Sequence, residues 1–147
     1  MSDKSAGKRL FLRYAWPCAE YKRFAKKITD EEFKELSILV KTGKEPSVAL
    51  LERCFKDAVV SLRKFAEKTD AKGGAWSFET VAEFWRFHHG HKDDCRVRRA
   101  RILHFVDSVV VMLICMEKNF FALNVYGIPL KLGGEVYVHK SVIVEKI

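Results

Sequence analysis

The segment His88-His89-Gly-His91-Lys-Asp-Asp-Cys95 holds the densest group of chemically reactive side chains in the chain. Imidazole nitrogens and a thiolate are ligands that zinc and iron prefer. A metal site here would use His89, His91 and Cys95, with a further ligand from elsewhere in the chain. The same residues also fit the end of a helix, where histidines complement the helix dipole, followed by a polar loop. The sequence leaves both interpretations open.

An arginine-rich segment follows Cys95 directly. Guanidinium groups can hold phosphate oxygens through paired hydrogen bonds, and aromatic side chains on a neighbouring strand can stack on bases. This pattern predicts a surface that binds nucleic acid or another anion. The alternative is a solvated edge strand that its charge protects from aggregation. The arginines are Arg96, Arg98, Arg99 and Arg101, and the aromatic candidates are Phe120, Phe121 and Tyr126.

No catalytic residue can be assigned from the sequence. It contains no P-loop, no Rossmann glycine signature, no G-x-S-x-G and no HExxH. A nucleophile, a base and an oxyanion hole cannot be assembled from the remaining residues. We therefore expect a binding or accessory protein rather than an enzyme that acts alone.

The histidine, cysteine and arginine residues lie at the start of a β-rich segment, which we place at residues 93–147. β-Branched and aromatic residues dominate it, and turn-forming residues interrupt it at short intervals. Short, closely connected strands of this kind predict a five-stranded barrel of the OB or SH3-like type. In the first strand, Val97 points to one face, and strict alternation would put Arg99 and Arg101 on that face. Ala100 and Ile102 nevertheless look like the buried pair, so we expect a bulge near Arg98–Arg99. The expected strands are 96–105, 108–116, 120–126, 135–139 and 142–147.

Residues 1–90 predict a helical segment. Residues 1–9 are expected to form a loose arm. Thr29 is a typical N-cap for a helix that ends at Gly43. Apolar residues at three- and four-residue steps predict one helix over 46–66, and Ser77 begins another that runs to about Phe87. The fold class is therefore α+β, with the helical segment expected to pack on the barrel.

The chain ends in Leu132-Gly-Gly-Glu-Val-Tyr-Val-His139-Lys-Ser-Val-Ile-Val-Glu-Lys-Ile147, and the barrel segment begins at Cys95-Arg-Val-Arg-Arg-Ala-Arg-Ile102. This ending is similar to V-G-D-x-V-x-V-H-x-G-x-A-I-E-K-I, and the spacing from the cysteine to the last isoleucine is similar too. Residues 95–147 thus resemble the small hydrogenase-maturation chaperones of the HypC/HupF type. The resemblance implies an OB-like barrel, a metalloenzyme subunit as partner, and iron-centre delivery through Cys95 and His139.

Composition limits the compartment and the partners. The N-terminus has no secretory signal, and no apolar run is long enough to span a membrane. The four cysteines form no CxxC pair, so free thiols are expected in a cytoplasmic protein. A net charge of +8 favours an anionic partner, either nucleic acid or an acidic protein surface. The leading prediction is an accessory protein with a chaperone-like, metal-binding barrel, and the alternative is a nucleic-acid-binding module.

Overall fold

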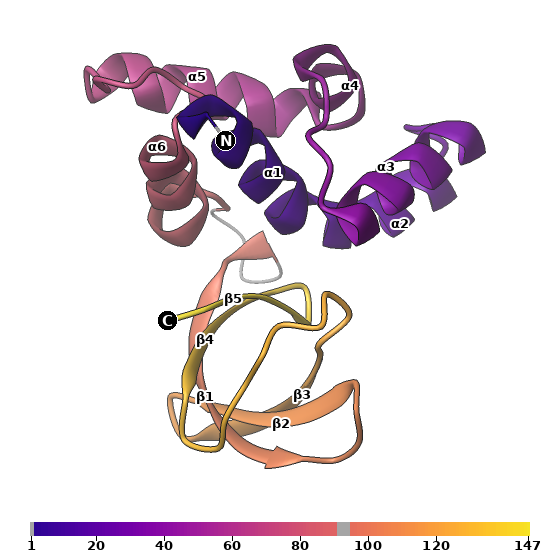
Figure 1. Cartoon of the computed structure of the whole chain (residues 1–147), viewed down its shortest axis with the longest axis vertical. Helices are drawn as coiled ribbons and strands as arrows, with labels where there is room; N and C mark the ends of the chain where they lie inside the picture. Colours follow the sequence, from indigo (N-terminus) through magenta and orange to yellow (C-terminus); the bar gives the residue numbers. More distant parts are fainter. Residues whose placement is uncertain (1, 91–94) are drawn as a thin grey trace. The chain divides into compact units, whose positions relative to one another are not determined.

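The computed structural model describes residues 2–90 and 95–147 of the chain (Figure 1). The chain divides into two compact units, a helical unit up to His89 and a β-barrel unit from Gly90 onward. The predicted α+β class is confirmed. The helical unit contains α1 (Asp3–Ala15), η1 (Trp16–Cys18), α2 (Ala19–Phe24), α3 (Asp30–Thr42), α4 (Val48–Cys54), α5 (Lys56–Lys68), α6 (Phe78–Glu83) and η2 (Phe84–His88).

Helix α1 replaces the loose arm that the sequence predicted. Ser2 caps it, because its hydroxyl accepts a hydrogen bond from the Ser5 backbone N–H at 3.1 Å. Gly7 lies against the loop before α6, where a Cβ atom would stand only 1.9 Å from the carbonyl oxygen of Trp76. The ring of Phe11 is fully buried and meets the Trp85 ring edge-on at 5.3 Å. Gly7 therefore allows α1 to pack closely against this loop.

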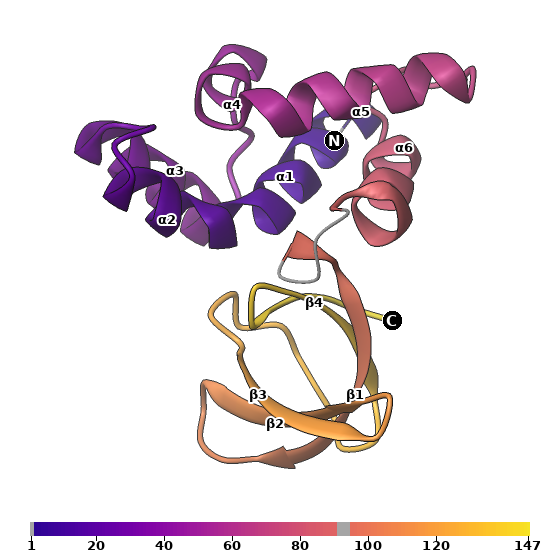
Figure 2. The ribbon, with the colours of Figure 1, turned by 180° about the vertical axis from the view of Figure 1, so that it is seen from behind.

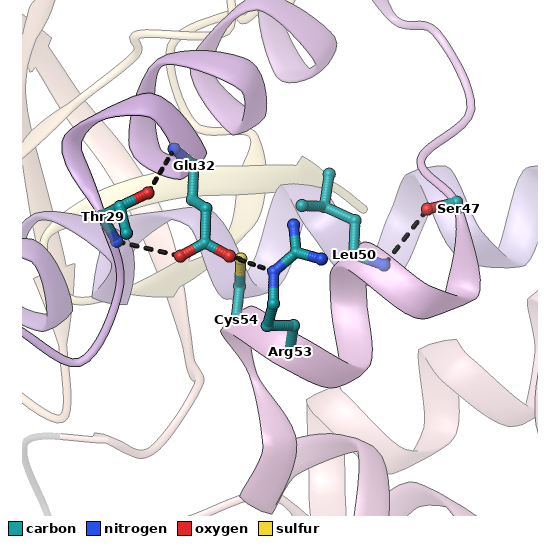
Figure 3. A network of polar contacts seen from close by, with 6 residues as sticks. All are labelled: Thr29, Glu32, Ser47, Leu50, Arg53 and Cys54. Carbon is teal, nitrogen blue, oxygen red and sulfur yellow. Dashed lines mark hydrogen bonds and ion pairs between the residues drawn. The ribbon is translucent and has the colours of Figure 1, made fainter.

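A polar network joins the start of α3 to α4, as Figure 3 shows. The Thr29 hydroxyl accepts from the Glu32 backbone N–H at 3.0 Å, and a Glu32 carboxylate oxygen accepts from the Thr29 backbone N–H at 2.9 Å. This is a capping box. The other carboxylate oxygen pairs with Arg53 on α4 and lies 3.8 Å from the Cys54 thiol. The Arg53 hydrogen bond, followed by that from Thr29, lowers the pKa of Glu32.

The predicted single helix over 46–66 is broken. Helix α4 begins after Ser47, whose hydroxyl accepts from the Leu50 backbone N–H at 3.1 Å, and it ends at Cys54. Phe55 then leaves helical geometry, with φ of −130° and ψ of 48°. Its side chain is buried, so tertiary packing overrides the local helical pattern. The predicted cap at Thr29 and the stop at Gly43, which has φ of 67°, are both confirmed.

The barrel unit is a closed, five-stranded barrel, as predicted. The strands follow one another around the ring in the order β1-β2-β3-β5-β4, and β4 pairs back onto β1 (Figures 1 and 2). All neighbours are antiparallel except β3 and β5. This order matches the five-stranded Greek-key barrel of the OB type. The strands are β1 (Arg98–Phe105), β2 (Val110–Cys115), β3 (Lys118–Leu123), β4 (Glu135–His139) and β5 (Val142–Lys146).

The irregularity in β1 lies further along the strand than predicted. Pairing with β4 continues without a shift from Arg98 to Arg101. The register instead shifts against β2 between Ile102 and His104. The buried Val97 precedes the strand, so its burial requires no bulge within β1. The barrel core consists of Ala100, Ile102, Val111, Leu113, Ala122, Val136, Val138 and Ile143.

We predict that Glu32→Ala destabilises the protein by about 1 kcal/mol more than Glu31→Ala. Both residues belong to the first turn of α3, but Glu32 alone completes the capping box and pairs with Arg53. Because folding lowers the pKa of Glu32, its contribution is present above the ordinary value of 4.5 and is lost as pH falls below it. Thermal unfolding of both variants at neutral and acid pH measures this. Equal melting temperatures at neutral pH would contradict the prediction.

Candidate nucleic-acid interface

The outward face of β1, β2 and β3 carries polar and apolar side chains in cross-strand rows. His104 on β1 lies opposite Met112 on β2, and Met112 lies opposite Phe121 on β3. The adjacent row joins Arg101 on β1 to Ile114 on β2. Residues directly opposite one another have side chains within contact range on the same face. We call this surface the β1–β3 face, and it includes Arg101, His104, Met112 and Phe121.

The four predicted arginines separate into different places. Arg99 and Arg101 lie on the outer side of β1, opposite Tyr137 and Glu135 of β4. Arg98 alternates with them and lies beside the buried Val138 on the other side of the strand, although its own side chain is exposed. Arg96 is exposed and precedes the strand. The structure thus places two of the four arginines on the β1–β3 face.

The two outer arginines differ in their electrostatic surroundings. Arg99 pairs with the Glu135 carboxylate, and that hydrogen bond raises the pKa of the guanidinium. Arg101 is exposed and forms no ion pair with any residue in the described ranges 2–90 and 95–147. Of the two guanidinium groups on this face, Arg101 is therefore the one that can take up an incoming anion without first losing a partner among the described residues.

Among the predicted aromatic residues, Phe121 is the one suited to stacking. Its side chain is 56% exposed on the outer face of β3. Phe120 instead packs partly against the barrel core, and Tyr126 is half-buried in the segment after β3. Leu123, also exposed, continues the apolar surface along β3. A flat exposed ring on the same face as a cation is an arrangement that can bind unpaired bases and their phosphates.

The hairpin between β1 and β2 borders this face and is held by Asp107. One carboxylate oxygen of Asp107 accepts from the backbone N–H groups of Val109 and Val110, at 2.8 and 2.7 Å. These hydrogen bonds, that from Val110 first, lower the pKa of Asp107. The loop presents the exposed side chains of Val106 and Val109 beside the rows. In OB barrels, the loop between the first two strands contributes to the binding surface.

The predicted metal ligands occupy different environments. His139 ends β4 opposite Val142, and its side chain is 0% exposed. Cys95 is partly exposed in the same unit, close to Gly90, where a Cβ atom would lie 2.6 Å from the Cys95 carbonyl oxygen. His89 belongs to the helical unit, and its ring centre lies 4.0 Å from that of Trp85. His91 lies outside the described residues.

No metal cluster is present within the described part of the chain. There, no three His, Cys, Asp or Glu side chains come close enough together to hold an ion. Because His91 and the two aspartates before Cys95 fall outside that part, the proposed ligand set is not tested. The metal site stays a prediction.

Sequence reasoning missed His104 and Met112. Both become part of the surface only through strand pairing, which brings them into one row with Phe121. A local signal for Met112 exists, because it alternates with the buried Val111 and Leu113. No such signal marks His104, since the register shift beside it is invisible in the sequence.

Comparisons with protein-family models, with curated proteins and with solved structures give no match to this chain. The likeness of residues 95–147 to hydrogenase-maturation chaperones therefore remains an expectation from the sequence. None of the helices in the described ranges is long and apolar enough to cross a membrane.

We predict that Cys54 is the least reactive of the four cysteines. Burial raises the pKa of its thiol to about 11, and the nearby Glu32 carboxylate adds to the effect. At about pH 8 only roughly one Cys54 in a thousand would then be a thiolate, the form that attacks iodoacetamide. Mass spectrometry of timed alkylation should show Cys54 modified last, behind the half-buried Cys18, Cys95 and Cys115. Labelling of Cys54 at the rate of the others in the folded protein would contradict this.

Proposed function

We propose that this protein binds single-stranded nucleic acid through the β1–β3 face of its barrel. The main observation in support of this proposal is the cross-strand row His104–Met112–Phe121, which lies beside the row of Arg101. The exposed Phe121 ring offers a stacking surface, and Arg101 offers a phosphate ligand. The net charge of +8 attracts such a polyanion over a longer range.

Single strands fit this surface better than duplexes. Phe121 can stack only on a base whose face is accessible, and base faces in a duplex are covered by their neighbours. Stacking does not distinguish strongly among bases, so little sequence preference is expected. The OB-type strand order also agrees, because such barrels bind oligonucleotides over strands two and three.

We predict that Phe121→Ala weakens the binding of a fluorescent single-stranded oligonucleotide about tenfold, since one stacked ring is lost. Phe121→Leu should weaken it similarly, because it keeps an apolar side chain without the flat ring, whereas Phe121→Trp should retain binding. The matched control is Met116→Ala, at a 91% exposed position in the turn after β2. Fluorescence anisotropy measures the affinities. Wild-type affinity in both Phe121→Ala and Phe121→Leu would remove Phe121 from the interface.

We predict that Arg101→Ala makes binding less dependent on salt. For single strands, the logarithm of the binding constant falls with the logarithm of salt concentration by about 0.7 for each neutralised phosphate. Loss of Arg101 should therefore flatten the slope by about that amount. Lys146→Ala removes an exposed charge at the end of β5, and its slope should match wild type. Identical slopes for Arg101→Ala and wild type would show that Arg101 contacts no phosphate.

A second proposal, supported by the closing hairpin, is an accessory role in metalloenzyme maturation. The segment with the chaperone-like ending forms the hairpin of β4 and β5, with His139 as the last residue of β4 and Cys95 in the same unit. This proposal expects zinc or iron to bind in a manner that needs Cys95. Metal analysis of untagged protein should then show metal that Cys95→Ala loses and Cys115→Ala keeps. Metal content that is equal in both variants, or absent from wild type, would overturn it.

A further inference from the structure

A second exposed group of aromatic and basic side chains lies on the helical unit, at α2 and the turn after it. Phe24 is 88% exposed and Tyr21 is 64% exposed. Exposure of single apolar residues is ordinary, but these two lie among four cationic residues within a stretch of seven. We call this surface the α2 patch, and it consists of Tyr21, Lys22, Arg23, Phe24, Lys26 and Lys27.

The rings of this region are already in contact with cations. The Lys27 ammonium lies 5.9 Å from the centre of the Tyr21 ring, and the Arg23 guanidinium lies 4.3 Å from the Phe33 ring. Arg23 also pairs with Glu20, the acid next to the patch. Helix α2 lies beside α3 in both views of the ribbon (Figures 1 and 2). The outer side of α2 therefore presents aromatic rings within a predominantly cationic surface.

The turn that ends α2 contains two of these cationic residues, Lys26 and Lys27. Lys26 has φ of 59°, in the left-handed region that non-glycine residues adopt at an energetic cost. The Lys27 backbone N–H donates to the Lys22 carbonyl at 2.8 Å, which closes the turn. Ile28 then returns to the core with a buried side chain. This turn therefore leaves Lys26 and Lys27 exposed directly after α2.

We propose that the α2 patch is a second contact surface for single-stranded nucleic acid, a step that rests on the function proposed for the barrel. Exposed rings between several cations combine stacking with phosphate neutralisation. An anionic membrane is a less suitable occupant, because α2 has only six residues and exposes two aromatic rings rather than a long apolar face. Two contact surfaces on one chain raise the affinity for a strand long enough to reach both.

The test uses the full chain and a single-stranded oligonucleotide of about 30 nucleotides, longer than the roughly 4–16 nucleotides that one OB barrel covers. Phe24→Ala should weaken its binding about tenfold. Lys26→Gly removes a charge while it favours the left-handed turn, so binding should weaken without a fall in melting temperature. Ile38→Ala, at an exposed position on α3, is the control that should bind like wild type. Ultraviolet crosslinking should also join the oligonucleotide to the peptide that contains Tyr21 and Phe24.

The outcomes separate this inference from the proposed function. If Phe121→Ala weakens binding and both α2 variants bind like wild type, the second contact is wrong and the barrel interface stands. If only the α2 variants lose affinity, the α2 patch stands and the barrel assignment is wrong. If wild type does not bind the oligonucleotide, both are wrong. Sedimentation with vesicles of phosphatidylserine and phosphatidylcholine tests whether the α2 patch binds a membrane. Vesicle binding that Phe24→Ala abolishes, with oligonucleotide affinity unchanged, would assign the patch to a membrane surface instead.

Discussion

Closure of the barrel is the constraint on which the rest of the β unit depends. β1 pairs with β4, and β3 meets β5 at Leu123 and Val142, where the Leu123 backbone N–H donates to the Ser141 carbonyl at 2.8 Å. A closed ring leaves no free strand edge and divides side chains strictly into inside and outside. The small interior accepts residues such as Ala100 and Ala122 and so directs Arg101 and Phe121 outward.

The sequence predicts those parts of the fold that depend on local patterns. Alternation and turn residues locate the strands to within a few residues, and Thr29 and Gly43 mark both ends of α3. Features that depend on distant contacts are missed. Gly7 in α1 is required because a Cβ atom there would clash with the Trp76 carbonyl, and the break at Phe55 reflects burial of its side chain. For the candidate site, residue types identify Arg101 and Phe121, but only the strand register joins them to His104 and Met112.

The two proposed surfaces share one physical pattern in different secondary structure. On the barrel, strand pairing puts Phe121 on β3 and Arg101 on β1 on the same outer face, with β2 between them. On α2, consecutive residues around a tight turn set Phe24 and Tyr21 among lysines. Water exposure of a large ring has little benefit for a folded chain, while a ring beside a cation can hold a base and its phosphate together. We therefore propose an oligonucleotide as the anionic partner, because it would use both the charge and the exposed rings.

The most direct test of this account is to map the contacts residue by residue on the intact protein. Backbone amide signals of isotopically labelled protein can be followed by nuclear magnetic resonance during titration with a single-stranded oligonucleotide. We predict that the shifts concentrate at Arg101, His104, Met112 and Phe121 on the barrel, and along Tyr21 to Lys27 at α2 and the turn after it. Unchanged spectra at saturating oligonucleotide, or shifts confined to residues outside these two surfaces, would contradict it.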